Sequence, residues 1–227
     1  MPSVSKRQSA QLSSVAVADA ADAAKGQIRQ ANESLILEAA ERVFAGAGFS
    51  GATMAAIAEA AGLPKANLHY YFGNKQDLYR AVLARTLSDW LAPTHGITPE
   101  ADPATALGDY IRDKMRLSQQ RPHASKVFAN ELLHGAPVLQ TLLETELRDL
   151  VREKAAVLDG WVAQGRMAPV NTVHLFFTIW SATQTYADFD VQIAAVLGRS
   201  ALTPKDYAQA TGHVVGLILR GCGLTPS

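Results

Sequence analysis

The sequence has very little cysteine: Cys222 is the single one among 227 residues. One cysteine can form neither an internal disulfide nor a cysteine-based zinc cluster, and scarce cysteine is typical of a reducing compartment. No apolar run approaches the roughly 18 residues of a membrane helix, and the alanine-rich N-terminus lacks the apolar core of a signal peptide. We therefore expect a cytoplasmic protein with no membrane partner.

An excess of charge of one sign is also missing. The 21 Lys and Arg residues balance 21 Asp and Glu residues, so the formal net charge is zero. A protein that coats nucleic acid without selectivity depends on neutralising many phosphates at once. Any contact with DNA must therefore use a local patch.

Patterns of catalytic or metal-binding residues are absent as well. An α-helical enzyme that acts on a small heterocycle is an alternative class, but it would need a nucleophile, a base or a metal cluster. The histidines are scattered without the spacing of metal ligands; they are His69, His95, His123, His134, His174 and His213. We therefore expect no enzyme, no catalytic residue, no metal site and no cofactor.

No segment alternates with the period of a β-strand, whereas prolines and N-cap residues mark successive helix starts. These starts are Asn74, Asp102-Pro103, Pro122, Pro137, Asn171 and Thr203-Pro204. The sequence predicts an all-α protein of about nine helices, three in an N-terminal domain and about six behind it. We expect a disordered arm at residues 1–27, the N-terminal domain at 28–74 and the second domain at 75–227.

The stretch from Thr53 to Asn74 holds two short helical patterns joined by a turn. Thr53 is a good N-cap, and apolar residues recur after it with helical spacing. Gly62 fits the left-handed end of this helix, and Pro64 suits the first turn of the next one. Two helices joined by a short glycine-containing turn are typical of the helix-turn-helix, whose second helix lies in the major groove. The domain at 28–74 is therefore predicted to bind DNA.

Basic and hydroxyl side chains gather on the second of these helices. Such side chains favour phosphate contacts, which position a protein on the duplex without reading its sequence. Asn67 is the best candidate for a base contact, because its amide can pair with adenine. The predicted DNA-binding residues are Thr53, Lys65, Asn67, His69, Tyr70, Tyr71 and Lys75.

Gly46, Gly48 and Gly51 spell G-x-G-x-x-G, the fingerprint of a dinucleotide site. That fingerprint requires a preceding strand within a βαβ unit, whereas a helical pattern precedes these glycines. We interpret them as a sharp turn before the helix-turn-helix, with Phe49 packed beneath.

Residues 33–80 resemble the DNA-binding domain of the TetR family of regulators. The matching motifs are I-L-x-A-A-x-x-V-F from Ile36, T-x-x-x-I-A-x-x-A-G from Thr53 and Y-Y-F-x-N-K-x-x-L from Tyr70. Over about residues 30–197, segments such as ELLHGAP, GWVAQGRMAP and IWSATQTYADF resemble the subgroup of this family that regulates pyrimidine utilisation. The resemblance implies a homodimeric repressor that binds a palindromic operator and is released by a small pyrimidine such as uracil or thymine.

The resemblance also implies an effector cavity among the helices of the second domain. Lys114 and Gln184 are polar residues that fall on apolar stripes. The amide of Gln184 can donate to a pyrimidine carbonyl and accept from the adjacent N–H, and Trp90 can stack on the ring. A family member with another heterocyclic or lipophilic effector is the alternative. The predicted effector-binding residues are Trp90, Lys114, Phe128, Trp180, Thr183 and Gln184.

Residues 173–182, VHLFFTIWSA, are apolar almost all round, so a helix there must be covered on every side. A partner chain is predicted to supply one cover, with the helix from Pro204 completing a four-helix interface; burial within one chain is the alternative. We expect the helix from Asn74 to Ala92 to act as a lever, since it carries Lys75 at its DNA end and Trp90 at its ligand end.

Overall fold

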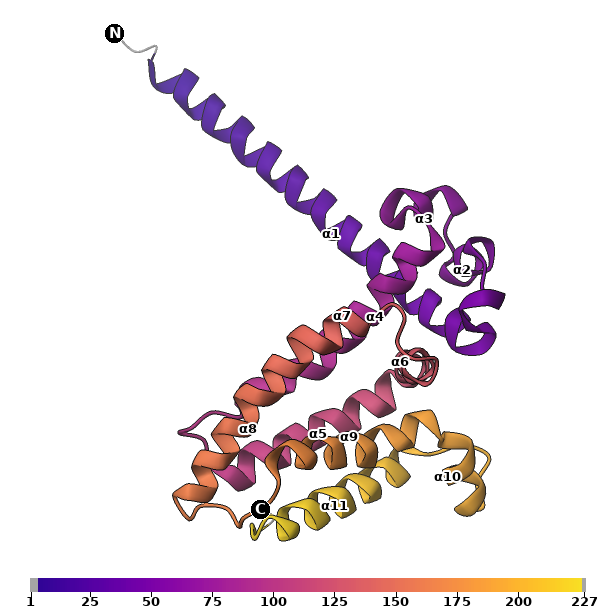
Figure 1. The fold of residues 1–227 in the computed structure, drawn as a ribbon. Coiled ribbons are helices and arrows are strands. Elements are labelled where there is room, and N and C mark those ends of the chain that lie inside the picture. The colour runs from indigo at the N-terminus through magenta and orange to yellow at the C-terminus, as the bar shows by residue number, and fades with distance from the viewer. Residues whose placement is uncertain (1–3, 226–227) are drawn as a thin grey trace.

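The computed structural model describes the backbone of residues 4–225 and the side chains of residues 26–225. This part of the chain contains helices and no strand, which confirms the all-α prediction (Figure 1). The helices are α1 (Val4–Gly51), α2 (Met54–Ala61), α3 (Lys65–Phe72), α4 (Lys75–Leu91), α5 (Pro103–Gln120), α6 (Pro122–Leu133), α7 (Gln140–Leu142), α8 (Arg148–Ala163), α9 (Thr172–Asp188), α10 (Asp190–Val196) and α11 (Pro204–Gly221). A 3₁₀ turn, η1 (Ala92–Gly96), follows α4, and a π-helical stretch, η2 (Leu143–Leu147), joins α7 to α8.

The structure differs from the sequence expectation at three places along the chain. Pro137 lies in a turn, and the helical segment expected to start there begins at Gln140. The backbone is helical from Val4, so α1 takes in most of the stretch 1–27 for which we expect a disordered arm; the side chains up to Lys25 lie outside the described residues, and the role of this stretch stays a prediction. The short helix α10 was not predicted, because seven residues between Phe189 and Leu197 give too little periodicity to recognise.

The helices begin where their N-cap residues predict. The side chains of Thr53, Asn74, Asn171 and Thr203 each accept a hydrogen bond from the backbone N–H three residues further on. At the end of α2, Gly62 has a φ of 66°, the left-handed conformation that glycine adopts without steric cost. These local signals fix the spacing of α2, α3 and α4, and they therefore set the helix-turn-helix.

The glycine-rich stretch forms a break within α1. Gly48 has a φ of 67° and a ψ of 173°, outside helical geometry, and the chain changes direction there before α2. Phe49 follows the break and packs against Tyr79, with 4.9 Å between the ring centroids. This arrangement agrees with the interpretation of the glycines as a turn with Phe49 beneath it.

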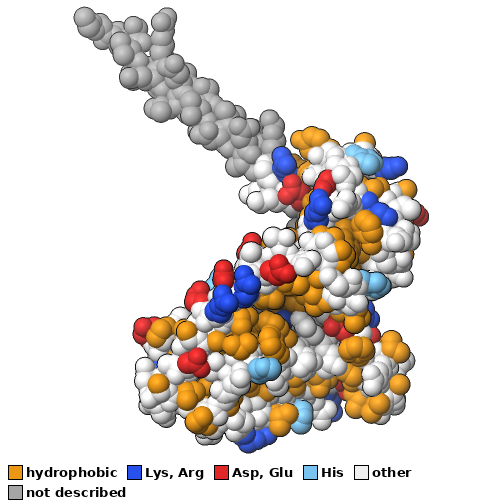
Figure 2. All heavy atoms as spheres, in the orientation of Figure 1, with side chains coloured by type: hydrophobic (Ala, Val, Ile, Leu, Met, Phe, Trp, Pro, Cys, Tyr) orange, Lys and Arg blue, Asp and Glu red, His pale blue; other side chains and the backbone are white. Residues whose placement is uncertain are grey.

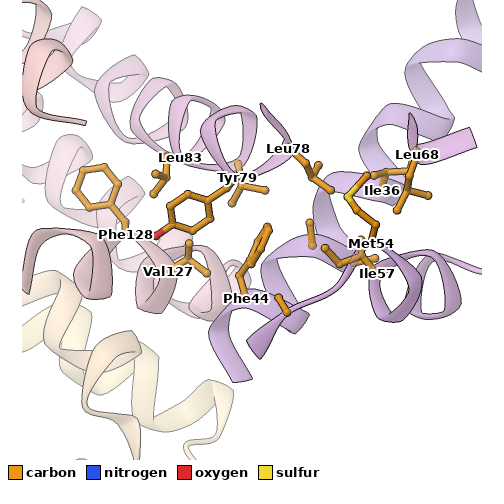
Figure 3. Packing of buried hydrophobic residues seen from close by; sticks show 14 of the residues in the cluster. Ile36, Phe44, Met54, Ile57, Leu68, Leu78, Tyr79, Leu83, Val127 and Phe128 are labelled. Atoms are coloured by element: carbon orange, nitrogen blue, oxygen red, sulfur yellow. The ribbon is translucent and has the colours of Figure 1, made fainter. Parts of the chain in front are cut away.

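One apolar core runs from the DNA-binding domain into α4 and α6. Figure 3 shows Tyr79 of α4 between Phe44 of α1 and Val127 of α6, and all three side chains are buried. Phe44 and Tyr79 meet edge to face at 5.0 Å. Because side chains from both domains fill this core, a displacement of α4 or α6 is transmitted to the helix-turn-helix by packing.

A second core holds the C-terminal helices together. α5 lies at its centre and packs against both α9 and α11, which run side by side in Figure 1. Trp161, Tyr110 and Phe176 are among its largest fully buried side chains. The indole of Trp161 donates to the carbonyl of Pro99 at 3.2 Å, so the buried polar atom of this residue is satisfied.

Candidate DNA-binding surface and effector cavity

The second helix of the helix-turn-helix, α3, turns one narrow apolar face inward. Leu68 is fully buried, while Lys65, His69 and Tyr70 are exposed. Tyr70 has 74% of its surface exposed, although its ring meets that of Tyr71 edge to face at 5.2 Å. Three of the seven predicted DNA-binding residues therefore share the outer face of α3.

Asn67 and Tyr71 lie at the flank of the same helix and are half-buried. The hydroxyl of Tyr71 accepts a hydrogen bond from Asn32 Nδ2 of α1 at 3.1 Å, so this tyrosine also fastens α3 to the domain. The His69 Nδ1 lies 2.7 Å from the carbonyl oxygen of Gly73. Because a carbonyl only accepts, Nδ1 carries the proton and Nε2 is left as the second nitrogen for another contact.

Lys75 and Thr53 both have structural partners within the domain. Lys75 Nζ donates to the carbonyl oxygens of Phe49 at 2.7 Å and Ala52 at 3.0 Å, and it lies 4.5 Å from the centroid of the Phe49 ring. An ammonium has three donors, so one is left for a phosphate. The Thr53 hydroxyl accepts from Ala56 N at 3.1 Å and caps α2. Their predicted DNA contacts stay predictions.

One further residue on the outer face of α3 was missed. Ala66 is exposed beside Lys65. A methyl group can contact the methyl of thymine in the major groove, but alanine gives no signal in a sequence. Figure 2 shows Lys, Arg and His side chains, with Asp and Glu side chains among them, over the module formed by the end of α1, α2 and α3. The helix α3 itself carries Lys65 and His69 and no acidic residue, so its surface is locally basic on a chain of zero net charge.

A cavity of about 80 Å³ lies between α4, α5, α6, η2 and α9. Five of the six predicted effector-binding residues line it, although they come from four separate helices. The lining residues are Leu87, Trp90, Leu91, Lys114, Phe128, Leu132, Leu143, Leu147, Trp180 and Gln184. Because it is the candidate site for the predicted effector, we call this space the effector cavity. Its walls are mostly apolar with a few polar groups, as is typical of sites for small molecules.

The aromatic walls of the effector cavity are held in fixed orientations. Trp90 and Phe128 meet at 61° with their ring centroids 4.8 Å apart. Trp180 Nε1 donates to the hydroxyl of Tyr110 at 2.7 Å. Tyr110 is buried, and this burial raises the pKa of its hydroxyl to about 12, so it stays protonated. A flat ring entering the cavity would therefore meet pre-oriented aromatic surfaces.

Lys114 is the most unusual group in the effector cavity. Only 2% of this lysine is exposed, and its Nζ lies 4.2 Å from the centroid of the Trp90 ring. No described residue accepts a hydrogen bond from its Nζ. Burial lowers the pKa of Lys114 to about 7, although the nearby carboxylate of Asp188 opposes the change. Since its Nζ has no acceptor among the described residues, a ligand with an oxygen acceptor can bond to it without displacing a protein group.

Gln184 and Thr183 are neighbours in sequence but differ in their surroundings. Gln184 lines the effector cavity, and no described group bonds to its amide. The hydroxyl of Thr183 instead donates to the carbonyl oxygens of Ile179 at 2.8 Å and Trp180 at 3.2 Å within α9, and the residue is fully buried. The structure therefore brings Gln184 to the cavity and leaves Thr183 outside its lining.

A larger cavity, of about 460 Å³, lies where the two domains meet, between the end of α1, α4 and α6. Its buried carboxylate, Glu131, already accepts from the hydroxyl of Tyr79 at 3.1 Å and from the backbone N–H of Val138 at 2.6 Å. This carboxylate is therefore already satisfied within the protein. The other polar residues that line the space, Ser50, Gln76, Asn130 and His134, are exposed to solvent, so they are not fixed by burial to select a ligand. The smaller effector cavity is the better candidate site.

Two classes of feature are missing from the described residues. None of their helices combines the length and the apolar character that crossing a bilayer requires. They also hold no cluster of three or more His, Cys, Asp or Glu side chains placed to bind a metal ion.

The geometry is that of a helical protein with a helix-turn-helix at one end and a cavity in its helical body, as in DNA-binding regulators. Comparison with protein families agrees with it. Residues 36–82 match the family described as "Bacterial regulatory proteins, tetR family", and residues 83–225 match the "YcdC-like protein, C-terminal region" of such regulators. The chain belongs to the TetR family, and it is a transcription regulator and not an enzyme.

Individual relatives narrow this assignment. The chain is 41% identical over 191 residues to the HTH-type transcriptional regulator RutR of Escherichia coli (strain K12), a match that covers 84% of this chain and 90% of the relative. Among solved structures, the ketosteroid transcriptional regulator KstR2 of Mycobacterium tuberculosis aligns with a TM-score of 0.66 over 84% of this chain and 94% of its own, at 18% identity. At that identity the second comparison supports the fold alone.

Proposed function

We propose that the protein is a cytoplasmic repressor that binds a palindromic operator as a homodimer and is released by a small pyrimidine such as uracil or thymine, in control of pyrimidine catabolism. The observation that carries this proposal is the convergence of Trp90, Lys114, Trp180 and Gln184 on one small cavity. The likeness to RutR over most of the chain supports the same conclusion.

The size of the effector cavity favours a single small ring. Its volume of about 80 Å³ is well below the roughly 300–1,000 Å³ of pockets that bury drug-sized ligands. A lipophilic effector of several rings would have to displace Trp90 or Phe128, which are 7% and 5% exposed. A ligand of the dimensions of a pyrimidine needs much less rearrangement.

The polar groups of the cavity suit an imide edge. A pyrimidine such as uracil alternates C=O, N–H and C=O along this edge, and the amide of Gln184 can donate to the first carbonyl and accept from the N–H. Lys114 can donate a charge-assisted bond to the second carbonyl. A ring without this edge would leave buried donors unpaired, at a cost of about 1–3 kcal/mol each.

The surface of α9 and α11 supports the homodimer. Phe176 and Ile179 of α9 are buried, whereas Phe177 on the other side of the helix is 47% exposed. Leu217 of α11 is 58% exposed. Apolar side chains left exposed on two adjacent long helices are typical of a subunit interface, and a second copy would cover them. Two copies would then present their α3 helices to half-sites one or more helical turns apart.

Two measurements test the proposal. Selection from random-sequence DNA should yield a palindrome, and uracil should lower the affinity of the protein for that duplex in a fluorescence-anisotropy titration. In parallel, the melting temperature should rise with uracil or thymine but not with purines or hydrophobic drugs, because only a ligand of the folded state stabilises it. A rise with another compound class in place of pyrimidines would support the alternative effector, and turnover of uracil would refute a purely regulatory role.

A further inference from the structure

Arg121 joins three elements that lie far apart in the sequence. It stands between α5 and α6, as the C-cap of the first and the N-cap of the second. Its guanidinium makes a two-pronged ion pair with Glu41 of α1, with Nε donating to Oε2 at 3.1 Å and Nη2 to Oε1, and its Nη1 donates to Asp89 of α4 at 2.9 Å. We call these three residues the Arg121 network.

The network is built on a buried carboxylate. The side chain of Glu41 is 4% exposed and that of Arg121 is 20% exposed, whereas Asp89 is 38% exposed. Burial works against the charge of Arg121, but the hydrogen bonds and charges of the two carboxylates outweigh it, so the pKa of the guanidinium is raised. A buried ion pair is a weak source of net stability, but its planar bidentate geometry fixes the relative position of the elements that carry it.

Every branch of the network leads toward the effector cavity or the DNA-binding domain. Asp89 directly precedes Trp90, which lines the cavity. Lys114 and Phe128, seven residues before and after Arg121, line it as well. Glu41 lies in the part of α1 that belongs to the DNA-binding domain.

The α5–α6 junction is also fastened to α9, the helix that carries Trp180 and Gln184. Ser118 of α5 donates to the carbonyl oxygen of Thr183 at 3.0 Å, and Ser125 of α6 donates to Asp188 at 2.6 Å. The junction therefore follows any movement of α9, and Arg121 is its direct charged contact with Glu41 of the other domain.

We propose that Arg121 is the positioning residue that couples the effector cavity to the DNA-binding domain. This inference rests on the proposed effector response but concerns its transmission. A ligand between Trp90, Lys114 and Phe128 moves α4 relative to the α5–α6 junction. The ion pair between Arg121 and Glu41 can then persist only if α1 moves together with the junction. The coupling runs through α5 and α6 in addition to the lever α4, because the guanidinium binds carboxylates on both α1 and α4.

The test measures how strongly uracil weakens binding to a duplex that carries the palindrome selected by the unaltered protein. The coupling factor is the ratio of operator Kd with saturating uracil to operator Kd without it, and values of about 5- to 150-fold are typical of allosteric proteins. For Arg121→Met we expect uracil to bind within about twofold of the unaltered protein while the coupling factor falls below about twofold. An unchanged coupling factor in Arg121→Met would overturn the proposal.

Matched variants separate coupling from loss of structure. Arg112→Met removes a half-buried arginine of α5 whose partner, Asp109, is exposed, and it should keep the full coupling factor. Asp89→Asn leaves the bidentate pair between Arg121 and Glu41 in place and should give an intermediate coupling factor. If Arg121→Met fails to fold, Asp89→Asn becomes the test of the proposal. An unchanged coupling factor in Asp89→Asn would then refute it. Arg121→Lys can keep one ion pair but not the two-pronged geometry, and it should restore only part of the coupling.

A measurement without effector keeps this inference distinct from the proposed function. If uracil does not bind the unaltered protein, the effector assignment fails, and the coupling is read from operator affinity alone. Trp90→Ala alters the cavity and should therefore change the operator Kd. We expect the fold-change that Trp90→Ala causes to be at least threefold smaller in the Arg121→Met protein than in the unaltered protein. Additive effects of the two substitutions would mean that the cavity does not act through Arg121.

Discussion

The DNA-binding surface and the effector cavity treat the same side chain in opposite ways. Lys75, beside the helix-turn-helix, has its ammonium bonded to two backbone carbonyls. Lys114, in the cavity, is buried without an acceptor among the described residues and faces the Trp90 ring. The first lysine stabilises a surface that is complete before DNA arrives. The second offers a donor in the cavity that an acceptor on a ligand can use.

Under the proposed function, this difference assigns the response to effector to the cavity and not to the DNA-binding surface. A satisfied, exposed surface binds DNA as a rigid body, and its affinity depends on charge and shape. An acceptor on a ligand can bond to Lys114 without displacing a protein acceptor, whereas the ammonium of Lys75 already makes two bonds within the protein. The Arg121 network contacts elements of both regions, so we infer that it transmits the effect of ligand binding from the cavity to the DNA-binding surface.

The largest expected effect is a difference in the free energy of unfolding between two alanine variants, one that replaces an aromatic residue in each region. Trp90→Ala removes a buried side chain from the cavity wall and should lower the free energy of unfolding by about 3–5 kcal/mol. Tyr70→Ala removes an exposed one and should change it by less than about 0.5 kcal/mol while weakening operator binding. Urea denaturation of both variants checks the contrast, and equal losses of stability would contradict it.

The titration of Lys114 should be visible in stability. Its pKa is about 7 in the folded protein and 10.5 when unperturbed, so between these values the unfolded chain binds one more proton. Stability should therefore rise with pH, by about 2 kcal/mol between pH 7 and pH 9, and flatten below pH 7. Unfolding free energies of the unaltered protein minus those of Lys114→Met isolate this group, because every other titration is shared. A difference that does not change with pH would show that Lys114 is not buried as a neutral amine.

How far the sequence predicts this architecture depends on the range of the interactions. The caps at Thr53, Asn74, Asn171 and Thr203 act over three residues, and all four were predicted. Gln184 and Lys114 were found because a polar residue interrupts an apolar stripe, and the TetR resemblance supplied the reason to bring them together. Within one helix, periodicity therefore suffices to locate candidate residues.

Interactions between segments that are distant in the sequence could not be predicted from periodicity. Arg121 and Glu41 are 80 residues apart, and each resembles an ordinary surface charge in the sequence. The leucines Leu143 and Leu147 line the cavity but have the spacing of any core stripe. The prediction for Lys75 was incomplete for the same reason. The carbonyls of Phe49 and Ala52 that accept its hydrogen bonds are brought to it by the break at Gly48, far from Lys75 in the sequence. Tertiary placement decides the roles of these residues.

The two candidate amides should have separable roles. Gln184→Ala should weaken uracil binding by about 1–3 kcal/mol, or roughly 5- to 150-fold, because the imide edge loses its partner, and the preference for operator over random DNA should stay unchanged. Asn67→Ala should leave uracil binding intact and narrow that preference. Calorimetric uracil titrations and competition with random DNA measure both quantities. If Gln184→Ala also lost the preference for operator over random DNA, the two regions would not have separate roles.

The smallest expected effect concerns Lys65 on the outer face of α3. If its ammonium neutralises one phosphate, Lys65→Ala should reduce the slope of log K against log salt by about one and weaken operator and random DNA alike. Arg152→Ala, which removes an exposed arginine from α8 in the other domain, should leave the slope unchanged. A fall in operator affinity alone would instead assign Lys65 to a base edge, where arginine and lysine read guanine. The salt slope thus decides whether the outer face of α3 only positions the protein or also reads sequence, since uncharged Asn67 and Tyr70 change affinity without releasing a counterion.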